Sequence, residues 1–160
     1  MLTPRITNLV IFFGCTGLIL TGLYMQHVMG LIPCALCITQ RIFIIATGVI
    51  ALLACLHNPA ATGRRIYAAL GILLALTGSA FSGRQIWLQH LPEDQVPACG
   101  PGLSYLFDTF PWQEALSVLL RGDGNCAEVV WTFLGMSIPM WTFVAFMGLA
   151  GFNLWQLLRR

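Results

Sequence analysis

Two pairs of cysteines are the residues of this chain whose type and spacing could do chemistry. Cys34 and Cys37 form a C-A-L-C motif at the start of an apolar run, and Cys99 and Cys126 lie in the longest polar segment. Cysteines three residues apart share a helix face and can close a small, strained and easily reduced disulfide. The pattern therefore indicates thiol–disulfide exchange, while structural disulfides or a zinc half-site remain alternatives.

The residues around the C-x-x-C motif favour a reactive thiolate. Pro33 precedes the motif, and proline suits the first turn of a helix, whose positive dipole end stabilises a nearby thiolate. Arg41 follows Cys37 by four residues, so both lie on one helix face. We expect its guanidinium to favour the thiolate form of Cys37 and to hold the polar head of a ligand. The alternative is an arginine that only extends toward the membrane surface.

The elements that position these residues are predicted to be membrane helices. The 160 residues are 58% hydrophobic and only 9% charged, with a mean hydropathy of +0.80, which excludes an ordinary soluble domain and gives no sign of a nucleic-acid partner. A span needs about 20 apolar residues. Residues 1–160 are therefore predicted to form one all-α membrane domain, a four-helix bundle in a lipid bilayer. The predicted spans are 7–26, 36–56, 66–87 and 137–157, with outer loops at 27–35 and 88–136.

Basic residues give the orientation of this bundle. Five of them fall on one side of the predicted spans: Arg5, Arg64, Arg65, Arg159 and Arg160. Short loops rich in Lys and Arg stay in the cytoplasm, so both termini are predicted to be cytoplasmic. All four cysteines of the two pairs then lie on the outer face, where a bacterial periplasm permits disulfides. Cys15 and Cys55 lie within spans, where we expect packing roles.

Two further segments carry expectations about packing. Gly14, Gly17 and Gly22 lie in the first span, where small residues are expected to let neighbouring helices approach closely. Between the loop cysteines, 110–120 has apolar residues at helical spacing, which predicts an amphipathic segment in the membrane interface. That segment would keep the long loop close to the C-x-x-C motif.

Several longer motifs carry a resemblance to a known family. They are Gln26-His27-Val28-Met29, Pro33 to Cys37 with Gln40-Arg41, Ser79-Ala80-Phe81 through Gln85 to His90, Cys99-Gly100-Pro101-Gly102, Asn125-Cys126-Ala127-Glu128, and Trp131 to Gly135 with Pro139 and Trp141. Together they resemble the disulfide bond formation protein B (DsbB) family of inner-membrane thiol:quinone oxidoreductases. The resemblance implies a four-helix bundle that reoxidises a periplasmic, DsbA-like thioredoxin-fold dithiol oxidase. The two electrons would pass to a membrane quinone, either ubiquinone or menaquinone.

The resemblance also implies a role for each matched cysteine. Cys99 corresponds to the loop cysteine that the partner's thiolate attacks, and Cys126 is its disulfide partner. Once released, Cys126 would exchange with Cys34. Cys37 corresponds to the cysteine whose thiolate contacts the quinone and donates electrons to it.

Two further matched positions concern the quinone. Arg41 corresponds to an arginine that supports the Cys37 thiolate and the quinone, and His90 to a histidine near the quinone, although a solvated boundary histidine is an alternative. Gln40 stands where some relatives have Glu, and Arg84 where some have an apolar residue. No metal site is expected, since His27 and His57 show no ligand spacing, and no c-type haem motif is present because Ile38 rather than His follows Cys37.

Two rival functions follow from the same cysteines. One is a quinone reductase of the vitamin K epoxide reductase type, whose redox pair belongs to a later helix than the second span. The other is a non-catalytic membrane scaffold in which two structural disulfides hold the outer loops. Resistance of both disulfides to cellular thiols would favour the scaffold.

Overall fold

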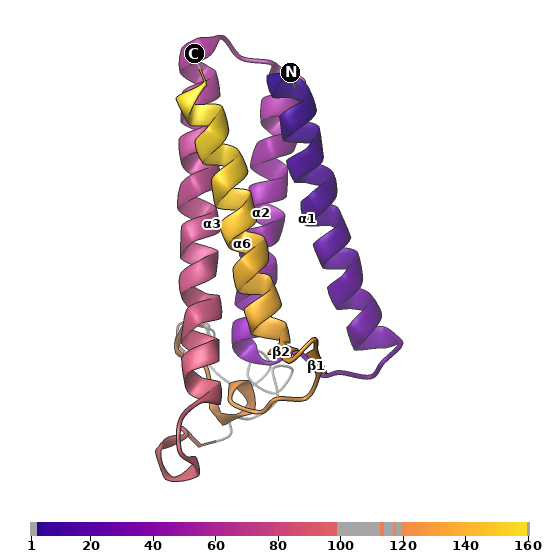
Figure 1. Cartoon of the computed structure of the whole chain (residues 1–160), viewed down its shortest axis with the longest axis vertical. Helices are drawn as coiled ribbons and strands as arrows, with labels where there is room; N and C mark the ends of the chain where they lie inside the picture. Colours follow the sequence, from indigo (N-terminus) through magenta and orange to yellow (C-terminus); the bar gives the residue numbers. More distant parts are fainter. Residues whose placement is uncertain (1–2, 99–112, 114–116, 118–119, 160) are drawn as a thin grey trace.

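Four long helices make up the bundle. The computed structural model describes residues 3–98, 113, 117 and 120–159. The helices are α1 (Pro4–His27), α2 (Ala35–His57), α3 (Ala61–Gln89) and α6 (Ile138–Leu158), and each is long and apolar enough to cross a membrane. They run alternately up and down, so both termini lie at one end and the α1–α2 and α3–α6 connections at the other (Figure 1). The predicted fold, a four-helix membrane bundle, is confirmed.

Capping residues explain where helices α1 and α2 begin. At the start of α1, the hydroxyl of Thr3 accepts a hydrogen bond from the backbone N–H of Ile6 at 3.4 Å. The N-cap of α2 is Cys34, whose sulfur accepts from the Cys37 backbone N–H at 3.4 Å. The first cysteine of the C-x-x-C motif therefore also caps its helix. Helix α3 begins at Ala61 rather than near residue 66, so Arg64 lies inside the helix and not in the preceding turn.

Close helix contacts occur mostly at glycines outside the first span. A Cβ added to Gly78 would overlap the ring of Phe146, and one at Gly71 would overlap the Asn153 side chain. Gly14 and Gly17 have no neighbour within 4 Å of such a Cβ, so their predicted packing role is wrong, whereas a Cβ at Gly22 would lie 3.4 Å from the Arg41 side chain of α2, as expected of a close contact. The tightest approaches at glycine between two helices occur in the α3–α6 contact.

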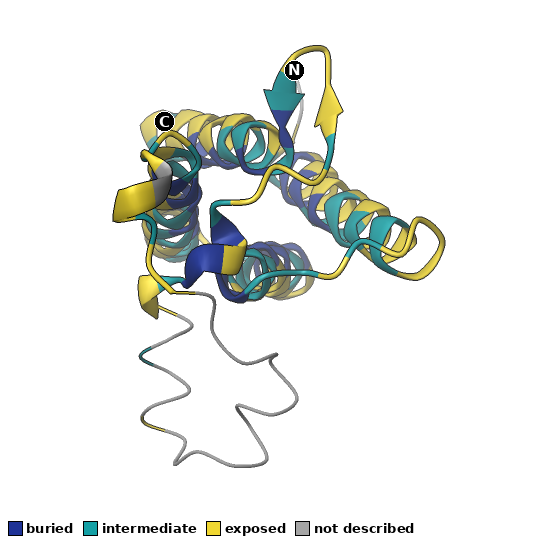
Figure 2. Ribbon diagram, turned by 90° about the horizontal axis from the view of Figure 1, so that it is seen from below, coloured by how far each residue is buried: buried dark blue, intermediate teal, exposed yellow. Residues whose placement is uncertain are grey.

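The outward faces of the helices are apolar, as a bilayer requires. Viewed from the loop end in Figure 2, buried residues lie where helices face each other and exposed residues lie outside. Phe13 and Leu73 are 65% and 62% exposed, which suits contact with lipid rather than water. The inner core includes Ile11, Ile44 and Phe146. Cys15 and Cys55 are buried free thiols, as expected for packing residues.

The segment after the long loop covers the ends of α2 and α3. It contains a short 3-10 helix, η2 (Gly124–Cys126), and an antiparallel hairpin of β1 (Thr132–Phe133) and β2 (Met136–Ser137). A second 3-10 helix, η1 (Glu93–Gln95), follows α3. Arg84 holds this segment against α3, because its Nε donates to the backbone oxygen of Arg121 at 2.7 Å. The predicted amphipathic segment at 110–120 lies outside the described residues apart from 113, 117 and 120.

Helix α1 is tied to α6 at one end only. Near the termini, Gln156 donates to the Asn8 side chain at 2.9 Å, and both side chains are buried. Toward the loop end, α1 leans away from the other helices (Figures 1 and 2). This divergence leaves space between α1, α2 and α6 next to the C-x-x-C motif.

Candidate functional site

Three cysteines from two distant segments meet at the loop end of the bundle. Cys34 and Cys37 lie at the start of α2, with their sulfurs 3.0 Å apart, and Cys34 is also hydrogen-bonded to Cys126 from η2. All three are free thiols. Cys126 is fully buried, whereas Cys34 and Cys37 are partly exposed. Cys34 therefore lies between the other two sulfurs, next to each possible exchange partner.

Backbone N–H groups at the start of α2 point at these sulfurs. The N–H of Cys37 donates to the Cys34 sulfur at 3.4 Å, and the N–H of Leu36 donates to the Cys126 sulfur. Such N–H groups have no partner within their own helix, so they are suited to stabilise a thiolate. The N-terminus of α2 thus serves both the C-x-x-C motif and the loop cysteine.

The hydrogen bond between Cys34 and Cys126 shifts the pKa values of the two thiols in opposite directions. Interactions with the neighbouring Cys126 and Cys37 sulfurs raise the pKa of the Cys34 thiol, and burial adds to this increase. The same hydrogen bond lowers the pKa of Cys126, although burial and the charge of Asp123 act in the opposite direction. A larger fraction of Cys126 than of Cys34 is therefore thiolate at a given pH, even though the protonated Cys126 thiol donates to Asp123 Oδ1 at 3.4 Å.

A side chain of α3 completes the surroundings of the C-x-x-C sulfurs. The Gln85 Nε2 group lies 3.3 Å from the sulfur of Cys34 and 3.4 Å from that of Cys37. Gln85 is only 3% exposed, and Gln40 beside it is 2% exposed. We did not assign a role to either glutamine from the sequence. The signal was present, since polar residues inside membrane spans are costly and often mark functional sites.

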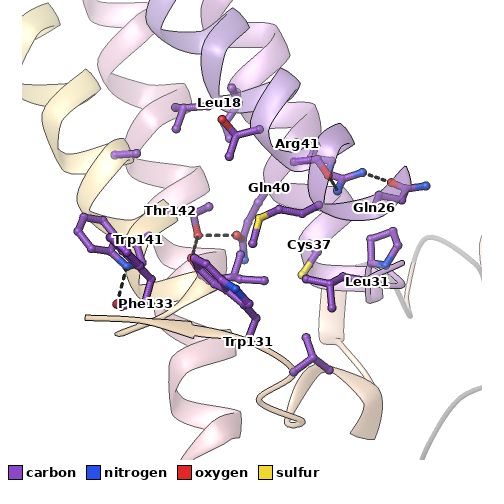
Figure 3. A pocket seen from close by; sticks show the side chains of 18 of the residues that line it. Leu18, Gln26, Leu31, Cys37, Gln40, Arg41, Trp131, Phe133, Trp141 and Thr142 are labelled. Carbon is purple, nitrogen blue, oxygen red and sulfur yellow. Dashed lines mark hydrogen bonds between the residues drawn. The ribbon is translucent and has the colours of Figure 1, made fainter. Parts of the chain in front are cut away.

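A cavity of about 440 Å³ adjoins Cys37 between α1, α2 and α6 (Figure 3). Its wall is mostly apolar and includes the aromatic side chains of Trp131, Phe133 and Trp141. Five polar side chains besides Cys37 also line it: Thr21, Gln26, Gln40, Arg41 and Thr142. Cavities of this size, apolar with a few polar groups, are typical of sites for small molecules and cofactors.

Arg41 lies on the wall of this cavity and is anchored to α1. One terminal nitrogen donates to Gln26 Oε1 at 2.6 Å, and the other donates to the backbone oxygen of Gly22 at 3.0 Å (Figure 3). These bonds hold the guanidinium at the cavity, on the α1 side of Cys37. In the described part of the chain, the side-chain hydrogen bonds to the Cys37 sulfur come from Cys34 and Gln85 rather than from Arg41.

The structure does not place His90 at this site. His90 is the exposed C-cap of α3, where its Nδ1 lies 2.8 Å from the backbone oxygen of Ile86, and it does not line the cavity. Cys99 lies outside the described residues. A cofactor-binding role for His90 and partner attack at Cys99 therefore stay predictions. Among the described residues, no group of three His, Cys, Asp or Glu side chains forms a metal site.

Comparison with known proteins identifies the family. The family model for disulfide bond formation protein DsbB matches residues 4–156. A disulfide bond formation protein B from Saccharophagus degradans is 62% identical over 156 residues, covering 98% of this chain and 94% of that protein. One from Stutzerimonas stutzeri is 51% identical over 158 residues, with 99% and 97% covered. The arrangement of helices and cysteines and this similarity along almost the whole length agree: the chain is a multi-pass membrane protein that belongs to the DsbB family of disulfide-forming oxidoreductases.

Proposed function

We propose that this protein transfers two electrons from a soluble dithiol protein to a membrane quinone. The observation that carries the proposal is the continuous order of sulfurs, in which Cys126 meets Cys34, Cys34 meets Cys37, and Cys37 lines the cavity. The order leads from the loop segment to a mostly apolar site inside the bundle. A membrane quinone combines a polar ring and an apolar tail, which suits a cavity with a few polar groups on an apolar wall.

The proposed reaction consists of thiol–disulfide exchange followed by reduction of the quinone. A partner thiolate attacks the Cys99–Cys126 disulfide at Cys99, and the mixed disulfide resolves to give the oxidised partner and two loop thiols. The Cys126 thiolate then attacks Cys34, breaking its bond to Cys37 and releasing the Cys37 thiolate at the cavity. Cys99 resolves the Cys34–Cys126 bond and restores the loop disulfide. Two electrons and two protons then leave the Cys34–Cys37 dithiol, and the quinone accepts them as it becomes quinol.

The burial of Cys126 supports the proposal that the partner protein attacks a different cysteine. Its sulfur is fully covered by residues that include Ala35, Leu36 and Leu88. A folded protein would have to displace this cover to reach Cys126, so Cys99 is the proposed contact. The proposed partner is a DsbA-like thioredoxin-fold oxidase with an exposed thiolate.

The distribution of arginines supports a location in the bacterial inner membrane. Arg5, Arg64 and Arg159 lie at the end that holds the termini, away from the redox cysteines. By the positive-inside rule, that end faces the cytoplasm and the cysteines face the periplasm. The oxidising periplasm is where a disulfide-forming enzyme would act.

The test is quinone reduction by the purified protein with a reduced DsbA-like oxidase, measured with ubiquinone and menaquinone analogues. Wild type should turn over with at least one of them, whereas Cys37→Ser and Cys99→Ser should not. Cys55→Ala is the matched control, because Cys55 is buried in α2 away from the site and should be dispensable. Absence of quinone reduction by wild type would refute the proposal and favour a scaffold with structural disulfides.

A further inference from the structure

We infer that Gln85 is a catalytic residue that stabilises the Cys37 thiolate through its side-chain amide. Gln85 projects from α3 toward the start of α2, and its Nε2 group is within 3.4 Å of both C-x-x-C sulfurs. The inference deepens the proposed function, since it concerns how the dithiol of that reaction is controlled. It assigns to an uncharged amide the contact that the sequence led us to expect from Arg41.

The orientation of the Gln85 amide is fixed by a second amide. Gln40 Nε2 donates to Gln85 Oε1 at 2.7 Å, so the Gln85 nitrogen is the amide atom nearer to both sulfurs, while its oxygen lies 3.7 Å from the Cys37 sulfur and accepts from the protonated thiol. Turning the Gln85 amide alone would place its N–H₂ group against that of Gln40. Gln40 is therefore a positioning residue for Gln85.

A threonine of α6 fixes the orientation of Gln40 in turn. The Thr142 hydroxyl donates to Gln40 Oε1 at 2.8 Å, the shortest of its contacts with oxygen acceptors. Ser82 donates to the Thr142 oxygen at 3.4 Å and helps to hold it. Each group thus donates to the next one: Thr142 to Gln40, Gln40 to Gln85, and Gln85 to the sulfurs. Three helices contribute to this network, which ties its geometry to the packing of the bundle.

This network places N–H donors where charge develops during exchange. When Cys126 attacks Cys34, the bond to Cys37 breaks and its electron pair remains on the Cys37 sulfur. The sulfur is surrounded by protein and apolar wall, where a hydrogen bond to a charged group is stronger than in water. Gln85 therefore stabilises the departing thiolate without adding a second charge to the membrane span, which would be costly.

The first measurement is the rate at which Cys37 reacts with N-ethylmaleimide in the fully reduced protein, followed by peptide mass spectrometry. Gln85→Met keeps the length of the side chain but removes the N–H donors. We expect about tenfold slower reaction of Cys37 near pH 6.5, where the thiolate fraction limits the rate. The difference between the two rates should disappear near pH 10, because the Cys37 thiol is then deprotonated in both proteins. Equal slowing at both pH values would show a change in access only and would overturn the inference.

Gln156→Met is the matched control for a lost glutamine. Gln156 has the same 3% exposure as Gln85 and also bonds to a neighbouring helix, but it lies near the C-terminus, at the far end of the bundle. The control should leave the Cys37 rate unchanged. Equal slowing in Gln156→Met and Gln85→Met would mean that the effect reports general loosening of the bundle, and the inference would fail.

Thr142→Val provides a second variant that leaves Gln85 and its sulfur contacts chemically intact. Loss of the Thr142 hydroxyl frees the Gln40 amide to turn, so we expect about threefold slower Cys37 reaction near pH 6.5. An unchanged rate of Cys37 alkylation would show that Thr142 does not position Gln40 and Gln85. This variant also carries the test if Gln85→Met does not fold.

Turnover separates this inference from the proposed function. Gln85 does not line the cavity of about 440 Å³ beside Cys37, so Gln85→Met should lower kcat while the KM for quinone stays unchanged. A raised KM with normal kcat would place Gln85 at the ligand rather than at the sulfur and overturn the inference. The alkylation experiment needs no quinone, so its result stands even if wild type reduces none.

Discussion

Replacement of Arg41 by methionine is expected to weaken the binding of quinone. The guanidinium lies on the cavity wall, and its bonds to Gln26 and Gly22 engage two of its five N–H groups. A remaining N–H group is expected to bond a quinone carbonyl. A hydrogen bond from a charged donor contributes about 1.5–3 kcal/mol, which corresponds to about a 10- to 100-fold rise in the KM for quinone.

The assay is steady-state quinone reduction at saturating reduced partner, with kcat and KM determined separately. Arg41→Lys should show a smaller rise, since lysine keeps the charge but loses the planar geometry that binds both Gln26 and Gly22. Arg65→Met is the control, because Arg65 is exposed near the start of α3, at the opposite end of the bundle. A lower kcat with unchanged KM in Arg41→Met would refute the reasoning, because it would place the charge at the sulfur rather than at the quinone.

Two further predictions concern acidity and packing. Cys34→Ala removes the hydrogen bond that lowers the pKa of Cys126, so the Cys126 titration should move to higher pH and leave less thiolate near neutral pH. The ¹³Cβ NMR shift of labelled Cys126 measures this, and an unchanged midpoint would contradict the assigned cause. Gly78→Ala should lower the free energy of unfolding by about 1–3 kcal/mol, because the added Cβ overlaps Phe146. Gly17→Ala, where nothing lies within 4 Å, is the control in thermal unfolding, and equal losses in the two variants would refute the packing argument.

The helices were predictable because the bilayer leaves few alternatives. An apolar run of about 20 residues has to satisfy its backbone hydrogen bonds internally, and a helix does so within one segment. Composition therefore identified the four spans. The start of α3 was less accurate, because Arg64 and Arg65 suggested a loop although arginines can extend from a helix end toward the interface.

The contacts between helices were not predictable from the same pattern. Gly17 and Gly78 both lie in apolar runs, yet only Gly78 faces a neighbouring helix closely. Which face of a lipid-exposed helix turns inward depends on tertiary packing, since both lipid and core are apolar. The amide network was missed for a similar reason: Gln40 and Gln85 are far apart in sequence and are joined only when α2 packs against α3.

The candidate site was therefore predictable in its sulfurs but only partly in its surroundings. Proline, the C-x-x-C spacing and Arg41 are local signals, and the structure places Cys37 and Arg41 on the same cavity wall. Cys126 meets Cys34 through the fold of the segment after the long loop. Gly122, with φ of +77°, is where this segment passes so close to Leu36 that a side chain would collide. A sequence pattern alone does not show such a crossing.

The described cysteines that are proposed to exchange electrons, Cys34, Cys37 and Cys126, lie at one end of the bundle. Helix α2 extends about 34 Å from the C-x-x-C motif to its other end, at about 1.5 Å per residue. The described redox cysteines and the cavity are at its first turns, while the arginine-rich end is remote. Moving one charge across a membrane costs or yields about 2.3 kcal/mol per 100 mV. If both electrons and both protons are exchanged at the same face, turnover is electrically neutral across the bilayer. The membrane potential then neither drives nor opposes the exchange itself.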